Sequence, residues 1–271
     1  MKHIAVALLL LFPVLLAMGQ KASVEHSDVP IYLNTGMGMG VSRYYDGGVS
    51  PLVYSGVGLG ANLGVTVEWF RFRASIDNRL DGCLGAGNKA DTSAGANGGT
   101  FDMRMSFYYR FAEPLDGKMR LWVGADFNPY IDLRINRKMM NSAVGLTTMF
   151  GVNADFRLEF DIPSRRRTDL FTLYADISLP LMAMGDRPGY SYVYNATSSS
   201  NPIEYLIDGY ESYSILMQGA TTDIGIFFNL KNCNRVGLSY YWDYRTTRNA
   251  APHRFDNAYH FLCLNLMFNI H

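Results

Sequence analysis

Hydrophobic and polar residues alternate along much of the chain. In FDMRMSFYYRF (101–111), every odd-numbered residue is apolar or aromatic, and the positions between them include an aspartate and two arginines. The same period of two recurs in 121–136, 150–162 and 171–181. Across the four segments the polar face carries 11 charged residues and the apolar face carries none. Successive side chains of a strand point to opposite sides, so the pattern predicts amphipathic β-strands.

Six more segments carry a similar but less regular pattern. They are 30–42, 53–67, 69–78, 214–229, 235–245 and 258–270, which makes ten predicted strands. In 214–229 the alternation is lost near Gln218. Short links at 68–69, 112–118, 163–169 and 231–234 alternate with long ones at 43–52, 79–98, 137–147, 182–213 and 246–257. This order is typical of an up-and-down barrel and puts both chain ends on the short-link side.

Alternation alone leaves open whether the apolar face lies in a soluble core or against lipid. Strands of 11 or more residues favour a membrane barrel, because globular strands usually have about 5–6. Aromatic residues near the predicted strand ends resemble interfacial girdles; they are Tyr44, Tyr45, Trp69, Phe70, Tyr108, Tyr109 and the aromatics of 240–244. We therefore predict an all-β fold, a closed antiparallel up-and-down transmembrane β-barrel of about ten strands.

Glycine alternates with apolar residues in GMGMG (36–40) and GVGLG (56–60). Gly56-x-Gly58-x-x-Ala61 formally matches a dinucleotide-binding fingerprint, which requires a helix directly after the glycines. The next residues, VTVEWFRFRASI, favour a strand instead, because β-branched and aromatic residues dominate them. We interpret the glycines as lumen-facing, where they leave room for long Arg and Tyr side chains. The predicted lumen glycines are Gly36, Gly38, Gly40, Gly56, Gly58, Gly60 and Gly64.

With the polar face inward, charges of both signs share the lumen. The predicted network comprises Arg71, Arg73, Asp102, Arg104, Arg110, Asp126, Asp132, Arg134, Asp155, Arg157 and Glu159. Further inward carboxylates are expected at Glu68, Asp77, Asp161, Asp176, Asp223 and Asp243. An isolated buried charge costs several kcal/mol, so these groups should pair. A ten-stranded barrel is scarcely wider than the eight-stranded kind that side chains fill, so a structural network is expected, with a narrow acidic-leaning channel as the alternative.

The first 19 residues have the layout of a secretory signal peptide. Lys2 and His3 precede an apolar run at 4–17, and small residues stand at Ala17 and Gly19. We predict a signal peptide at 1–19, a short periplasmic segment at 20–28 and a single barrel domain at 29–271. The equal totals of basic and acidic residues (24 each) give no indication of nucleic-acid binding. Cys83, Cys233 and Cys263 form no CxxC pair and predict no disulfide framework.

With these features together, the chain resembles the small outer-membrane β-barrels of Gram-negative bacteria. Gln20 at the presumed cleavage site and the many tyrosines give it a Bacteroidota-like character. Many such barrels end in Phe, whereas this chain ends in Asn269-Ile270-His271. The resemblance implies export to the outer membrane and contact with outer-membrane lipid or lipopolysaccharide and with the barrel-assembly machinery. It implies a role in envelope structure or in partner binding, with the tyrosine-rich segment 182–213 as a candidate protein contact.

Enzymatic activity is the other alternative. Omptin-like proteases carry acidic residues and an Asp–His pair at the outer rim, and the weak catalytic candidates here are Asp243, His253 and Asp256. His260 has outward parity, which suits a residue at the lipid interface. Lipid A deacylase-like barrels need a His–Ser pair on the outer wall, and no predicted strand offers one. Metal-ligand spacing is absent, so no metal, no cofactor and no catalysis are expected.

Overall fold

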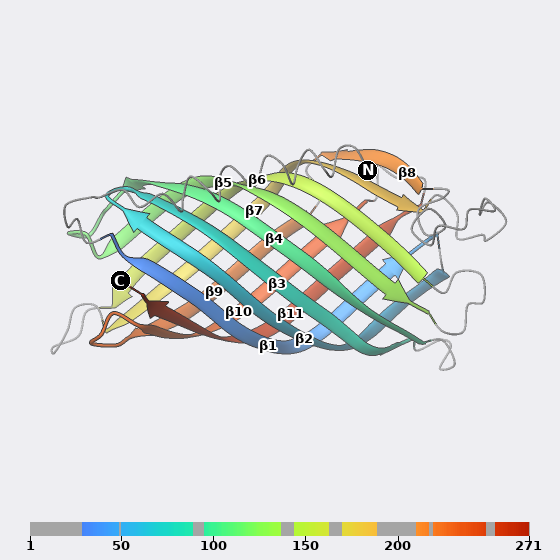
Figure 1. Ribbon diagram of the computed structural model, residues 1–271, viewed down its shortest axis with the longest axis horizontal. Helices are drawn as coiled ribbons and strands as arrows, with labels where there is room; N and C mark the ends of the chain where they lie inside the picture. The colour runs from blue at the N-terminus through green and yellow to red at the C-terminus, as the bar shows by residue number, and fades with distance from the viewer. Residues whose placement is uncertain are drawn as a thin grey trace.

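The computed structural model describes residues 29–48, 50–88, 95–136, 144–162, 170–188, 210–216, 219–247 and 253–270. These residues form a long barrel of antiparallel strands (Figure 1). The strands are β1 (Ile31–Asp46), β2 (Ser50–Trp69), β3 (Phe72–Gly87), β4 (Gly95–Ala112), β5 (Met119–Ile135), β6 (Val144–Ile162), β7 (Phe171–Pro188), β8 (Tyr210–Leu216), β9 (Gly219–Asn229), β10 (Arg235–Thr246) and β11 (Phe255–Asn269). The predicted signal peptide and the segment 20–28 lie outside the described residues.

The sheet closes on itself because β1 pairs with β11 and β6 pairs with β7. Strand β7 pairs with β9 along Phe171–Ser178 and with β8 along Met182–Pro188. β8 and β9 therefore lie end to end at one strand position of the barrel, which has ten strand positions as predicted. The predicted single strand 214–229 is wrong in this respect, since β8 ends and β9 begins on either side of residues 217–218. The break falls where the alternation is lost in the sequence.

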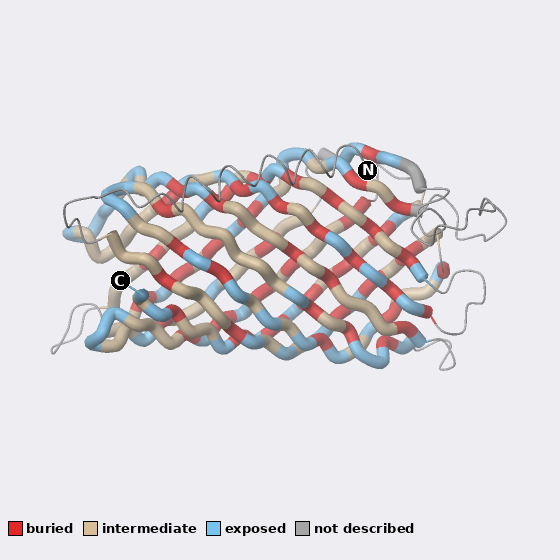
Figure 2. The backbone as a smooth tube through the Cα atoms, in the orientation of Figure 1, coloured by how far each residue is buried: buried red, intermediate tan, exposed pale blue. Residues whose placement is uncertain are grey.

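Apolar side chains cover the outer wall, and polar side chains fill the interior. Met37 is 72% exposed and Leu264 is 54% exposed, whereas Asp132 is 1% exposed and Glu159 is 2% exposed. More and less buried positions alternate along most of the strands (Figure 2). A soluble protein buries its apolar residues, so this inverted arrangement is that of a transmembrane β-barrel. The predicted orientation of the two faces is confirmed.

Several strands extend beyond the predicted ends. β3 and β4 continue through most of the glycine-rich stretch 79–98, and β7 and β8 extend into the predicted loop 182–213. The predicted long link at 43–52 shrinks to residues 47–49, so the long and short links alternate less regularly than expected. Strand pairing uses backbone groups, and a glycine has no side chain to reveal the period of two. The side-chain pattern therefore ends before the strands do.

The aromatic girdles are made up of partly different residues from those predicted. Tyr44, Tyr108 and Tyr241 point into the lumen and are 2%, 3% and 7% exposed, because adjacent aromatics in a strand face opposite sides. At the end that carries the short links, called here the short-link end, outward rings pack with centroids 5.4–6.1 Å apart; they include Trp69, Phe72, Phe107 and Tyr109, and the pair Phe171 and Phe228. At the opposite, long-loop end the outward rings include Tyr45, Trp242 and Tyr244, with Tyr240 further from the rim.

Candidate functional site

The candidate site is the lumen, where inward side chains from every part of the ring meet. Ten of the eleven charged residues predicted for the lumen lie on the inward face of their strands. Arg71 does not, and its prediction was wrong. β2 ends at Trp69 and β3 begins at Phe72, so Arg71 lies exposed in the turn with Phe70, whose φ of 51° is left-handed. Residues of a turn no longer follow the parity of the strand.

Near the short-link end, three arginines converge on Glu159 of β6. The Oε1 atom of Glu159 lies 2.8 Å from Nη2 of Arg73 and 2.9 Å from Nε of Arg157. Its Oε2 atom lies 3.1 Å from Nε of Arg120. The excess positive charge is matched nearby, since Arg73 also pairs with Glu68 at 2.5 Å, and the other two arginines pair with Asp161 and Asp176. The cluster is therefore a continuous network across β2, β3, β5, β6 and β7.

Further toward the long-loop end, Arg245 of β10 reaches across the lumen. It donates to Asp102 of β4 at 2.8 Å and to Asn128 of β5 at 2.7 Å, and its own neighbour Asp243 accepts at 3.1 Å. The guanidinium also lies 4.1 Å from the ring centroid of Tyr130. β10 and β4 are five places apart in a ring of ten, so this contact joins opposite walls.

A second set of contacts joins β5 with β11, which are also opposite. Asp132 accepts two bonds from Arg134, at 2.8 and 2.6 Å, and Arg134 donates to the hydroxyl of Tyr259 at 3.1 Å. Asn257 of β11 donates to Tyr130 at 2.7 Å and to Asp132 at 3.0 Å. All five side chains are at most 3% exposed, so water has little access at this level.

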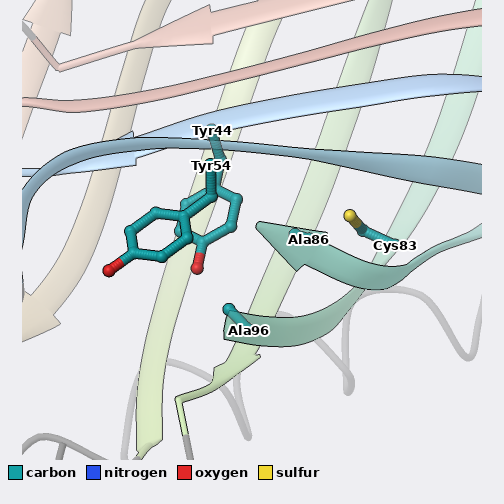
Figure 3. Packing of buried hydrophobic residues seen from close by; sticks show 5 residues of the cluster. All are labelled: Tyr44, Tyr54, Cys83, Ala86 and Ala96. Atoms are coloured by element: carbon teal, nitrogen blue, oxygen red, sulfur yellow. The ribbon is translucent and has the colours of Figure 1, made fainter. Parts of the chain in front are cut away.

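Aromatic packing adds to the closure beside these polar contacts. The rings of Tyr44 and Tyr54 stack with centroids 5.0 Å apart, and small side chains of β3 and β4 lie against them (Figure 3). The small residues are Cys83, Ala86 and Ala96. Arg134 lies 4.5 Å from the centroid of Tyr44, so the aromatic cluster and the ion pairs are in contact.

At the rim of the long-loop end, Arg187 of β7 makes the last cross-lumen contact. It donates to Asp46 of β1 at 2.5 Å and to the backbone carbonyl of His253 at 2.7 Å, and it is 2% exposed. The sequence analysis missed Arg187 because it placed this residue in a loop. It also missed Arg79, Arg120 and Arg245. The parity of Asp243, already assigned to the lumen, was the available signal for Arg245.

Free space is present in the middle of the barrel. A cavity of about 170 Å³ is bordered by residues of both charges, including Asp77, Arg79, Arg104 and Asp223. A polar cavity of this size has room for several water molecules. Next to it, Asp126 accepts from Asn153 at 2.7 Å and from Ser178 at 2.9 Å. The cavity lies between the Glu159 cluster and the cross-lumen contacts of Arg245.

The predicted lumen glycines all have inward parity, and they make room for neighbouring side chains. A Cβ at Gly58 would collide with the ring of Phe261, and one at Gly38 would lie 2.6 Å from the sulfur of Cys263. Near Gly60 and Gly64 the space is taken by Asp81 and Asp77. Arg79 also approaches Gly60, as predicted for arginine, but phenylalanine, cysteine, asparagine and carboxylate groups and backbone atoms occupy the rest of this room.

The two aspartates among the weak catalytic candidates do not come together. Asp243 faces the lumen, is 3% exposed, and accepts from Thr221 and Arg245. Asp256 faces outward and pairs with Arg254 at 2.5 Å. His253 lies at the rim, before β11 begins. Asp243 and Asp256 thus lie on opposite faces of the wall, and the geometry assembles no acid–base pair from them.

No metal or disulfide chemistry is visible in the described part of the chain. Within these residues, no group of three or more His, Cys, Asp or Glu side chains is placed to hold a metal ion. Cys83, Cys233 and Cys263 are free thiols, the first and last of them buried. Nor do the described residues include a helix long and apolar enough to cross a membrane.

No protein-family model matches the chain, and a search of curated proteins found no match. Among solved structures, Neisserial surface protein A is 9% identical over 89% of this chain and 97% of its own, with a TM-score of 0.34. The Pseudomonas putida toluene transporter TodX is 8% identical over 89% and 90%, with a TM-score of 0.37. The translocator domain of autotransporter NalP from Neisseria meningitidis is 9% identical over 99% and 98%, with a TM-score of 0.38. No activity follows from similarities at this level.

Proposed function

We propose that this chain is an exported outer-membrane β-barrel protein of a Gram-negative bacterium that does not conduct. It acts through its wall and its outer loops, in envelope structure or in binding a partner. The segment 182–213, of which residues 189–209 lie outside the described part of the chain, is the proposed protein contact, and the barrel-assembly machinery is the proposed partner during insertion. Catalysis has no role in this proposal. The Bacteroidota-like lineage stays a prediction from the sequence.

The observation that carries the proposal is the set of direct bonds between opposite walls. Arg245 joins β10 to β4 and β5, and Asn257 and Tyr259 join β11 to β5. Direct bonds between side chains of opposite strands leave little room for a hydrated pore at that level. Arg187 and Asp46 add a further contact toward the rim. Ion pairs of this kind favour a rigid support over a channel.

Single-channel recording in planar bilayers tests the proposal. The full mature chain should show no conductance steps. The double variant Arg245→Ala/Arg134→Ala removes two cross-lumen contacts, and it should give measurable steps or noisy leak if it remains folded. Conductance steps in the unmodified protein would contradict the proposal. Tyr109→Phe, a change on the outer wall, controls for handling and insertion efficiency.

A further inference from the structure

A small residue creates a hollow in the outer wall near the long-loop end. Ala258 of β11 lies between Arg43 of β1 and Tyr244 of β10 in the strand register. In the row nearer the loops, Asp256 lies beside Tyr45. The side chains around Ala258 border a pocket of about 830 Å³. This pocket is on the outward face, and the charged residues that border it, Arg43, Arg254 and Asp256, are not part of the lumen network.

The pocket carries more positive than negative charge. Arg43 is exposed and has no ion pair with any carboxylate in the described part of the chain. Arg254 pairs with Asp256 at 2.5 Å, and its guanidinium lies 5.7 Å from the ring centroid of Tyr45. Two arginines and one aspartate thus border the pocket. An arginine on a lipid-facing wall is costly without a counterion, and the planar guanidinium is suited to bidentate bonding with phosphate.

The wall below the pocket is apolar. Val41, Leu262 and Leu264 follow Arg43 and Ala258 toward the middle of the barrel and are 53%, 56% and 54% exposed. Beside them, the hydroxyl of Tyr240 lies 2.6 Å from Nδ1 of His260. A ligand with an anionic head and hydrocarbon chains would match both parts of this surface.

We propose that the pocket binds the phosphate-bearing headgroup of an anionic membrane lipid, whose acyl chains lie along the apolar wall below. Arg43 and Arg254 bind the phosphate oxygens, and the aromatic side chains of Tyr45 and Tyr244 flank the head. This inference rests on the proposed membrane placement, because the pocket must lie at the level of the lipid headgroups.

Native mass spectrometry of the full chain in a non-ionic detergent tests the site. The probes are bisphosphorylated lipid A and the same lipid without phosphates. The phosphorylated lipid should bind at least about tenfold more tightly, since bonds to charged groups are the stronger class. Arg43→Gln/Arg254→Gln should remove that advantage, while Arg71→Gln, an exposed arginine at the opposite end, should leave it unchanged.

Ala258→Leu provides a second variant that is independent of charge. The side chain points outward, so filling the hollow should weaken lipid binding without disturbing the lumen. Equal affinity for both lipids, or unchanged binding by both pocket variants, would overturn the site. So would full displacement of the lipid by millimolar inorganic phosphate, which would make the ligand a soluble anion. Tryptophan quenching by membrane lipids, described below, reports the membrane placement separately, so the two failures can be told apart.

Discussion

The two faces of β5 differ in what they require of a side chain. On the outer wall, Phe127, Ile131 and Leu133 are 36–42% exposed and need only be apolar. On the inner face, Asp132 and Arg134 are nearly inaccessible, and each has a specific partner. One backbone thus satisfies two different criteria at alternate residues. The outer wall depends on composition, whereas the lumen depends on pairing.

The lumen should therefore be the more sensitive face. Asp132→Asn would leave Arg134 without its carboxylate, and breaking a buried ion pair costs about 3–5 kcal/mol. Unfolding of the barrel in lipid vesicles by guanidinium chloride measures the change. The double variant Asp132→Leu/Arg134→Met is the control, because removing both charges should cost clearly less. A single variant as stable as the wild type would contradict the pairing.

On the outer wall, only the introduction of a charge should lower stability strongly. Leu264→Arg places a cation on the lipid-facing side near the middle of β11, with an expected loss of about 2–4 kcal/mol. Leu264→Phe keeps the position apolar and should change stability little. Equal stability of the two variants in the same unfolding assay would show that position 264 does not face acyl chains.

Substitutions of the lumen glycines test the size of a side chain instead of its charge. Any side chain at Gly58 collides with the ring of Phe261, so Gly58→Ala should cost about 1–3 kcal/mol through overpacking. A Cβ at Gly87 meets nothing within 4 Å, so Gly87→Ala is the matched control. If both substitutions had the same effect, the close packing around Gly58 would be refuted.

The smallest effect is expected in the aromatic girdle of the short-link end. Tyr109 packs with its ring centroid 5.4 Å from that of Phe72, and Tyr109→Ala should cost about 0.5–1.5 kcal/mol from the lost ring pair. Phe70 lies at the tip of the turn and is 84% exposed, so Phe70→Ala should stay within about 0.5 kcal/mol. If Tyr109→Ala and Phe70→Ala lowered stability equally, the ring packing of the girdle would not contribute to stability.

The alternation was enough to predict the fold class, the apolar outside and the inward parity of residues such as Asp132 and Glu159. It could not predict the ends of strands, so Arg71 was placed wrongly and Arg187 was missed. It also could not identify partners. Arg134 and Tyr259 are 125 residues apart and meet only because the ring closes with β5 opposite β11. Partner choice depends on this closure, which no local pattern contains.

The three tryptophans allow the central claim to be measured directly. Trp122 faces the lumen and is 2% exposed, whereas Trp69 and Trp242 face outward near opposite ends. Single-tryptophan variants, with the other two replaced by phenylalanine, are reconstituted in bilayers of brominated lipid, which quenches fluorescence on contact. The account predicts strong quenching of Trp69 and Trp242 and little of Trp122. Quenching of Trp122 as strong as theirs, or none at all three, would contradict it.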